Sequence, residues 1–349
     1  MRTIDDLLKE AQEYGASDVH ITVNRPPFFR IDGKLAPVGE NPLSKEEGAA
    51  MIEHLLGGSV KNTEALSRDR QVDFSYALPS GTRFRVNIFY HIDELSAALR
   101  LIPVHIQTVE ELHLPPQILQ FSELKQGLVL IVGPAGHGKS TTLAALIDHI
   151  NQNRREHIIP IEDPIEYLFS DIQSIIDQRE VGHDATSFAD AIRVTLRQDP
   201  NVIMIGEIRD QESMQTALTV AETGHLILAT MHTNDAGQTV ERIIDSFPPA
   251  QQQQVKSQLA NVLSGVVSQR LLPWASGGRI PGVEIMMATT AIRNVIREGA
   301  IHQIPGIIQT SSDVGMQTMD SSLQALVDAG AVRLEDARPY FSSVKRMLR

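Results

Sequence analysis

Eight consecutive residues carry the clearest chemistry in this sequence. They fit the pattern G-x-x-x-x-G-K-[S/T] and are followed by Thr141; in order they are Gly133, Pro134, Ala135, Gly136, His137, Gly138, Lys139 and Ser140. Glycines let backbone N–H groups curl around a phosphate, and a helix N-terminus adds partial positive charge. The lysine would reach the β- and γ-phosphates, and the serine hydroxyl would hold Mg²⁺. The pattern predicts a binding site for a nucleoside triphosphate, in which we interpret His137 as a solvated loop side chain.

Two groups of carboxylates follow this loop. Glu207 ends the apolar run 201–206 and could hold Mg²⁺ or its water shell. Glu162, Asp163 and Glu166 follow another apolar run. Hydrolysis of a γ-phosphate needs a residue that orients or deprotonates the attacking water, and a carboxylate suits this task. The alternative for the second group is a solvated turn.

Two histidines bracket the apolar run 226–231. His225 and His232 are seven residues apart, so they face opposite sides of a strand unless the strand ends before His232. No third nitrogen or sulfur ligand has metal spacing, so a zinc site is not expected.

Composition excludes several classes of protein. The chain has 349 residues, which suits two domains, and no cysteine, which excludes disulfides and thiolate zinc sites. Its net charge of −12 disfavours nucleic acid as a direct partner. No apolar run approaches the roughly 20 residues of a membrane span, and the N-terminus lacks the apolar core of a signal peptide. We therefore expect a cytosolic protein without membrane insertion.

The first hundred residues predict a small α+β domain, residues 1–102. Ile4, Leu7, Leu8 and Ala11 have helical spacing, and Thr3 with Asp6 has capping-box form. A strand over 18–23, a hairpin around Asp32 and Gly33, and a helix over 45–57 follow. Further strands are expected at 72–78, 82–90 and 96–103. The proline-bearing segment 103–116 has no clear period, and we interpret it as a linker.

From residue 117 to 349 the pattern changes to strands alternating with helices, which indicates a parallel sheet. The expected strands are 127–133, 157–163, 201–207 and 225–232, with helices at 140–150, 187–198 and 212–222. We expect the last hundred residues to be mostly helical, with 248–272 as the longest helical pattern.

Four motifs of this sequence, in their order along the chain, resemble those of one family, the ATPases of type II secretion and type IV pili. They are the Walker A motif 133–140, the Asp box 161–166, the Walker B-like end Gly206-Glu207 and the His box 223–233. The resemblance covers nearly the whole chain. It implies a RecA-like P-loop ATPase domain with a smaller N-terminal PAS-like domain, and a homo-hexamer that hydrolyses ATP with Mg²⁺.

The resemblance also implies roles for individual residues. Glu166 would be the general base or water-orienting residue, and Glu207 would support Mg²⁺. His225 and His232 would couple the γ-phosphate state to neighbouring subunits. Arg85 and Arg100, fifteen residues apart, would contact the nucleotide from the N-terminal domain, because an arginine fork matches the charge spread over a phosphate.

Two departures from the family pattern qualify these roles. His137 replaces the serine common at its position, which could alter nucleotide affinity. The Walker B-like strand carries no aspartate, so the ligands of Mg²⁺ beyond Ser140 stay open.

Within the family, segment 291–299 (AIRNVIREG) and segment 315–330 resemble the ATPases that retract type IV pili. The resemblance implies a platform protein of the inner membrane as partner, at the cytoplasmic base of the pilus, and a second retraction ATPase as a further possible partner. The alternatives are a related assembly, secretion or DNA-transport ATPase, and a weakly hydrolysing accessory subunit. The start of the chain at the PAS-like domain and the missing cysteines favour retraction over extension.

Overall fold

The computed structural model describes residues 2–31, 33–102 and 105–342. The chain divides into two compact units, Met1–Val104 with Glu166–Leu168, and His105–Ile165 with Phe169–Arg349. None of the described helices is long and apolar enough to cross a membrane.

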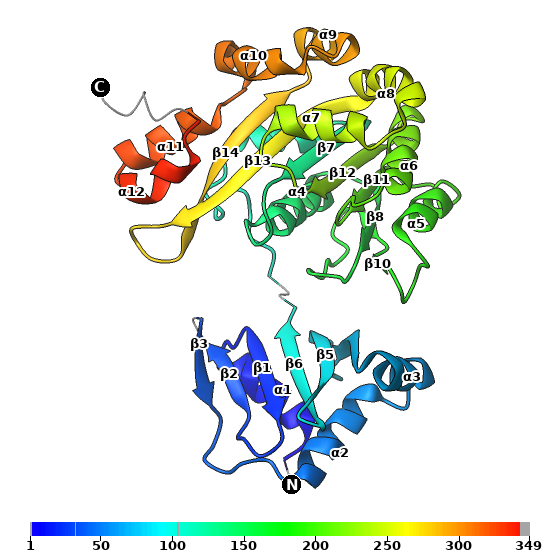
Figure 1. Ribbon diagram of the computed structural model, residues 1–349, viewed down its shortest axis with the longest axis vertical. Helices are drawn as coiled ribbons and strands as arrows, with labels where there is room; N and C mark the ends of the chain where they lie inside the picture. Colours follow the sequence, from blue (N-terminus) through cyan, green and yellow to red (C-terminus); the bar gives the residue numbers. More distant parts are fainter. Residues whose placement is uncertain (1, 32, 103–104, 343–349) are drawn as a thin grey trace. The chain divides into compact units, whose positions relative to one another are not determined.

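The first unit is an antiparallel sheet covered by helices (Figure 1). Its strands have the order β3-β2-β1-β6-β5-β4. The bounds are α1 Ile4–Glu13, β1 Asp18–Thr22, β2 Phe28–Ile31, β3 Lys34–Pro37, α2 Lys45–Leu56, α3 Val60–Asp69, β4 Gln71–Ala77, β5 Arg83–His91 and β6 Glu94–Leu101. The capping box of Thr3 and Asp6 is present, which confirms the predicted start of α1.

Alternation along β5 separates the two faces of this sheet. Phe84, Val86 and Ile88 are buried in one core with residues of α1 and α2, whereas Arg85 is exposed on the other face. Helix α3 was not predicted, because its sequence has few apolar residues. The predicted hairpin is present as β2 and β3, although Asp32 at its turn lies outside the described residues.

The second unit is built on a mostly parallel sheet, as predicted. Its strand order is β10-β8-β11-β12-β7-β13-β14, with β9 beside β8, and only β14 runs antiparallel to its neighbour. The strands are β7 Gly127–Val132, β8 His157–Glu162, β9 Ile175–Ile176, β10 Arg179–Glu180, β11 Val202–Ile205, β12 Leu226–Met231, β13 Leu263–Pro273 and β14 Arg279–Met287.

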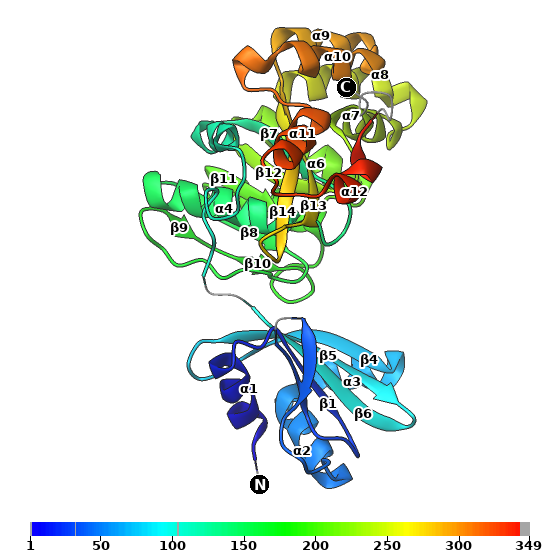
Figure 2. The same ribbon diagram turned by 90° about the vertical axis from the view of Figure 1, so that its left-hand side faces the viewer.

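Helices cover both faces of this sheet (Figures 1 and 2). Their bounds are α4 Lys139–Asn153, α5 Phe188–Thr195, α6 Gln211–Glu222, α7 Ala236–Asp245, α8 Pro249–Val262, α9 Thr290–Glu298, α10 Ile304–Thr310, α11 Met319–Asp328 and α12 Leu334–Ala337. Short 3-10 helices are η1 Pro116–Glu123, η2 Ile301–Gln303, η3 Ser312–Val314 and η4 Arg338–Tyr340. All six residues of β7 are buried, with Leu130 and Ile131 in the cores on opposite faces.

The predicted helical pattern over 248–272 is wrong in its second half. Helix α8 ends at Val262, and β13 begins at Leu263 beside β7. Pairing with β7 accounts for the change, and Gly265 permits this pairing, because a Cβ there would lie 2.1 Å from a ring atom of Phe121. The glycine thus lets the buried β13 backbone pass close to η1, and β14 follows as a second unpredicted strand.

The predicted linker 103–116 is divided by the structure. Residues 103 and 104 lie outside the described residues, and the remainder belongs to the second unit. Val109 and Leu114 are buried there in the same core as Ile118 and Phe121.

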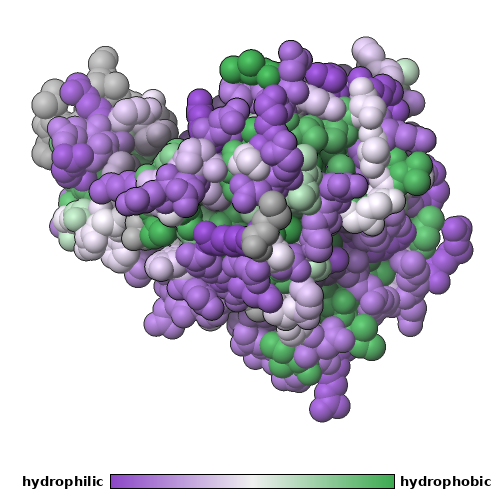
Figure 3. Space-filling model, turned by 90° about the horizontal axis from the view of Figure 1, so that it is seen from below, coloured by the Kyte–Doolittle hydropathy of each residue, from purple (hydrophilic) through white to green (hydrophobic). Residues whose placement is uncertain are grey.

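Hydrophilic side chains dominate the surface seen from below in Figure 3, where hydrophobic side chains form several separate groups. The exposed large hydrophobic residues are correspondingly spread along the chain, from Tyr14 and Ile92 to Ile175 and Leu334. Isolated apolar side chains of this kind are normal on a protein surface.

Candidate active site

The glycine-rich loop connects the end of β7 to the start of α4, the context that its motif requires. Gly133, Gly136 and Gly138 have φ of 152°, 75° and 82°, a region that side chains with a Cβ rarely adopt. Within the described residues no side chain caps the N-terminus of α4, whereas Asp210 caps α6. The start of α4 thus has no side-chain cap among the described residues, and a helix N-terminus of this kind favours an anion.

Lys139 is folded back into this loop and is 7% exposed. Its Nζ donates to the carbonyl oxygens of Gly133 at 2.9 Å and Pro134 at 3.0 Å, and lies 3.2 Å from Nδ1 of His232. The ammonium group therefore lies inside the loop, where a phosphate could replace carbonyl acceptors.

His232 joins Lys139 to the predicted metal-supporting carboxylate. Its Nε2 lies 2.9 Å from Oε1 of Glu207, whose Oε2 lies 2.9 Å from Nε of Arg209. Because an ammonium group can only donate, Nδ1 of His232 accepts from Lys139 and the ring proton resides on Nε2. The imidazole thus links the loop lysine to Glu207.

Parallel strands explain why these side chains meet. β7, β12 and β11 are neighbours in the sheet, and the loop, His232 and Glu207 follow their carboxyl ends. Carboxyl ends of parallel strands lie along one edge of the sheet, where ligands bind in open α/β folds. β12 ends at Met231, before His232, so the expectation that the two histidines face opposite sides of one strand does not apply.

His225 does not join this site within its own chain. It precedes β12, and its Nδ1 lies within 3.2 Å of the Val220 carbonyl and 3.0 Å of the Thr223 hydroxyl. Seven residues of extended chain span about 23 Å, so His225 lies at the opposite edge of the sheet from His232. Its predicted role at the nucleotide would need a neighbouring subunit and stays a prediction.

The Asp box carboxylates differ in their surroundings. Glu162 ends β8 and is 3% exposed, with Gly206 packed against its Cα and Cγ. Asp163 and Glu166 are exposed, and Glu166 belongs by its packing to the first unit. The structure brings Glu162 to the edge that also carries Glu207, whereas the role of Glu166 as base stays a prediction.

Three residues of β13 and β14 contact the loop and were not predicted. A Cβ on Gly133 would lie 2.5 Å from the carbonyl oxygen of Gln269, whose side-chain oxygen accepts a 2.7 Å hydrogen bond from Thr142. The N–H of Leu271 donates to Nδ1 of His137 at 2.9 Å. Arg279 donates to the Gly136 carbonyl at 3.1 Å. The interpretation of His137 as a solvated side chain is therefore wrong.

A cavity of about 360 Å³ borders the loop and the start of α4. Its walls combine apolar side chains with Gly138, Thr141 and Thr142. The apolar part consists of Leu112, Leu114, Leu271, Trp274 and Pro281. The rings of His113 and Trp274 form an edge contact with centroids 4.6 Å apart. A flat aromatic base fits such a wall, next to the site for its phosphates.

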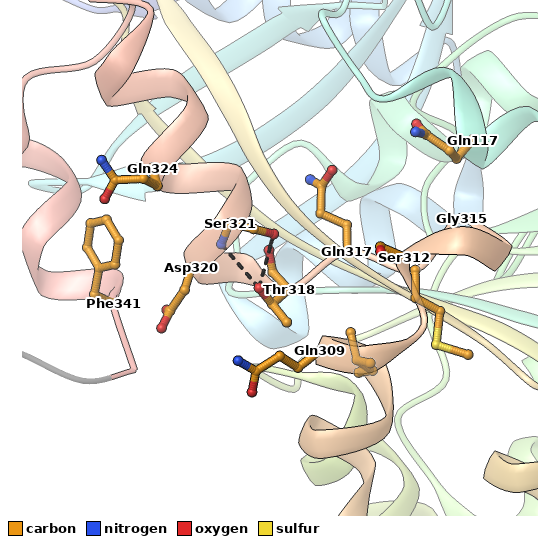
Figure 4. A pocket seen from close by; sticks show the side chains of 12 residues that line it. Gln117, Gln309, Ser312, Gly315, Gln317, Thr318, Asp320, Ser321, Gln324 and Phe341 are labelled. Carbon is orange, nitrogen blue, oxygen red and sulfur yellow. Dashed lines mark hydrogen bonds between the residues drawn. The ribbon is translucent and has the colours of Figure 1, made fainter. Parts of the chain in front are cut away.

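A second cavity, of about 530 Å³, shares no residue with the loop (Figure 4). It lies among η1, α10 and α11, and Gln117, Gln309, Gln317 and Gln324 contribute amide groups to its wall. Thr318 beside it caps α11 by accepting from the N–H of Ser321. Gln317 donates to the Val283 carbonyl, and Gln324 donates to Asp328 of its own helix.

In the first unit, Arg85 and Arg100 lie directly opposite each other on β5 and β6. Arg100 donates from Nε to Oδ1 of Asp18 at 2.8 Å, and Arg30 approaches the other oxygen at 3.6 Å. Burial opposes ionisation of Asp18, but hydrogen bonds from Arg100 and Ser17 outweigh it and lower the pKa of this carboxyl. Two guanidinium groups, those of Arg100 and Arg30, thus share the Asp18 carboxylate, and Arg85 lies beside Arg100 on the neighbouring strand.

The residues near the loop fit Mg²⁺ only together with a phosphate. Among the described residues no cluster of three or more metal-binding side chains could hold an ion alone. Ser140 in the first turn of α4 and Glu207 supply one hydroxyl and one carboxylate. Mg²⁺ is usually held by one or two such protein oxygens plus substrate phosphates and water, and the loop offers the phosphate site.

Comparisons with known proteins agree with this geometry. A family model described as "Type II/IV secretion system protein" matches residues 1–302. The "Type IV pilus retractation ATPase PilT" of Pseudomonas aeruginosa is 41% identical over 335 residues, covering 96% of this chain and 97% of that protein. The "Type IV pilus ATPase PilU" of the same organism is 40% identical over 97% of this chain and 88% of that protein. The crystal structure of the "Pilus Retraction Motor PilT and Bound ADP" superimposes with a TM-score of 0.91, at 44% identity, covering 99% of this chain and 98% of that one.

Proposed function

Since the chain belongs to the type II/IV secretion system protein family, we propose that it is a Mg²⁺-dependent ATPase that drives type IV pilus retraction as a hexameric motor. One observation carries the proposal, namely the contact chain from Lys139 through His232 to Glu207 beside the uncapped start of α4. This chain of contacts joins a phosphate-binding cation to a carboxylate at the edge of the sheet where the glycine-rich loop lies.

ATP would bind with its phosphates on the loop and its base in the cavity beside Trp274. Lys139 would exchange carbonyl acceptors for phosphate oxygens, which gives shorter charge-assisted hydrogen bonds. A water oxygen would then bond to the γ-phosphorus while the bond from that phosphorus to the bridging oxygen breaks. The proton of the water would pass to Glu166, and ADP would leave.

Mg²⁺ would be held by Ser140 and Glu207. When bound, it neutralises the negative charge that accumulates on the phosphate oxygens. His232 would hold Glu207 in place through Nε2–H and would release or engage Lys139 as the phosphates change. His225, at the other edge of the sheet, would contact a neighbouring subunit.

Arg85 and Arg100 would bring further positive charge to the nucleotide as the hexamer works. Guanidinium groups stabilise charge that spreads over a phosphoryl group in the transition state. Movement of the domain that carries these arginines would convert hydrolysis into mechanical work. The motor would act on a platform protein in the inner membrane, which it would reach from the cytoplasmic face. Nucleic acid would not be a direct partner.

Deletion of the gene tests the direction of the motor. Loss of a retraction motor leaves cells with pili that do not twitch, and complementation with the Lys139→Ala variant should not restore movement. Cells without pili would instead identify an assembly motor. Normal pili and normal movement would contradict a role in either process.

A second candidate is an accessory ATPase of a pilus motor, because the chain is nearly as similar to a relative described only as a type IV pilus ATPase, PilU, as to the retraction ATPase. The purified protein separates the two candidates. A motor should hydrolyse ATP with Mg²⁺ and lose this activity in Lys139→Ala. The accessory role would be favoured if the purified protein by itself does not hydrolyse ATP and the Lys139→Ala variant behaves in the same way.

A further inference from the structure

The end of β13 forms one wall of the phosphate-binding loop. The last pair between β7 and β13 is Val132 with Ser268, and β13 continues to Pro273. Beyond Ser268, the edge that faced β7 therefore faces the loop. Gly138 packs against this extension so closely that a Cβ would lie 2.8 Å from Nε2 of Gln269.

His137 takes the place of a strand partner on this edge. Nδ1 of its ring accepts the N–H of Leu271 at 2.9 Å, while Leu271 is paired on its other side with Pro281 of β14. A strand edge leaves alternate N–H groups without acceptors, and a partly buried N–H needs one. The half-buried imidazole supplies it from the loop.

This hydrogen bond requires a neutral ring with its proton on Nε2. An imidazolium would present N–H at both nitrogens and could not accept from Leu271. The charged groups that face the ring are Lys139 from α4, Arg270 from β13 and Arg279 from β14. Burial, followed by these three cations, lowers the pKa of His137, so the accepting form persists at neutral pH.

We propose that His137 is a positioning residue that fastens the phosphate-binding loop to β13 and thereby sets the affinity for ATP and ADP. The inference rests on the proposed nucleotide binding at this loop. The hydrogen bond of His137 is to the N–H of Leu271 in β13. His137 therefore affects the nucleotide only through the position in which it holds the backbone of the loop. The motif leaves this position open to any residue, so only the structure assigns the role.

The test compares binding of a fluorescent ADP analogue to the full chain at pH 7.5 and 5.0. His137→Asn keeps an oxygen acceptor near the place of Nδ1 but cannot take up a proton. We expect this variant to bind within about threefold of the wild type at pH 7.5, and His137→Ala to bind about tenfold more weakly, as the loss of one buried hydrogen bond predicts.

Between pH 7.5 and 5.0, a range that extends well below the ordinary pKa of histidine, the wild type should lose affinity more than His137→Asn. The phosphates of the probe titrate identically in both proteins, so the difference reports the ring. His183→Ala, which removes an exposed histidine, is the matched control and should behave as wild type.

Two outcomes would overturn the inference. One is wild-type affinity in His137→Ala, and the other is the same loss of affinity at pH 5.0 in wild type and His137→Asn. If His137→Ala fails to fold, the Asn comparison alone decides. Binding that is absent in the wild type, or unchanged in Lys139→Ala, would instead contradict the proposed function.

Discussion

Nε2 of His232 lies 2.9 Å from Oε1 of Glu207, which places the residue after β12 in contact with a residue that follows β11. Neighbouring parallel strands bring the two together although they are far apart in sequence. The other ring nitrogen faces Lys139, so one imidazole contacts both the loop lysine and the carboxylate. The three side chains therefore form one connected group.

The first prediction concerns this bridge. His232→Ala should lower kcat by about 10- to 100-fold, because it releases Glu207 and changes the surroundings of Lys139 while the loop itself remains. The KM for ATP should change little. Steady-state ATP hydrolysis measures both, with His183→Ala as a matched control, and an unchanged kcat would mean that the bridge has no part in hydrolysis.

The second prediction concerns Asp18, which contacts Arg100 at 2.8 Å. If Asp18 orients Arg100 for hydrolysis, Asp18→Asn and Arg100→Ala should each lower kcat, and the double variant should be no slower than Arg100→Ala. Asp69→Asn, in an exposed ion pair of the same unit, should have no effect.

The kcat values of these variants separate two hypotheses, namely that Arg100 takes part in hydrolysis and that Asp18 positions it. Normal turnover in Arg100→Ala would remove the arginine from the mechanism. A slow Arg100→Ala with a normal Asp18→Asn would remove only the positioning role of Asp18.

A third prediction follows from the lowered pKa of Asp18. Its carboxylate favours the folded state above the pKa of about 3.9 that it has in an unfolded chain, and this contribution is lost as pH falls through the lower folded value. Denaturant titrations between pH 5 and pH 3 should therefore show a steeper loss of stability in wild type than in Asp18→Asn. Parallel curves would show that Asp18 contributes no pH dependence.

The fourth prediction tests the packing of β13. Gly265→Ala should lower the free energy of unfolding by about 1–3 kcal/mol, because the added Cβ overlaps the ring of the buried Phe121. Gly306→Ala is the control, since no described atom lies within 4 Å of its Cβ position in α10. That variant should be neutral or more stable in chemical denaturation. Equal free energies of unfolding for the two variants would show that the ring of Phe121 moves to accommodate the added Cβ without loss of stability.

The sequence predicts those parts of the fold that depend on local patterns. The capping residues of α1, the apolar run of β7 and the glycines 133, 136 and 138 each act within a few residues. The same is true of the order of strands and helices from β7 to β12, which identified the parallel sheet.

The remainder depends on contacts between distant segments. Residues 263–273 have a composition compatible with a helix, and only their place beside β7 makes them a strand. The contacts of Gln269, Leu271 and Arg279 with the glycine-rich loop could not be predicted, because nothing in their spacing links them to the loop. The pairing of Arg85 with Arg100 likewise requires the register of β5 and β6.

Hydrolysis of ATP by the purified wild type and by Glu207→Gln, each with Mg²⁺ and with a chelator, tests the central claim most directly. The amide keeps the size of the side chain but removes the charge that supports Mg²⁺ and pairs with His232. We predict Mg²⁺-dependent hydrolysis by the wild type and a loss of roughly 100-fold or more in kcat in Glu207→Gln, with nucleotide still bound. Hydrolysis that persists in the chelator, or a Glu207→Gln variant as fast as wild type, would contradict the account.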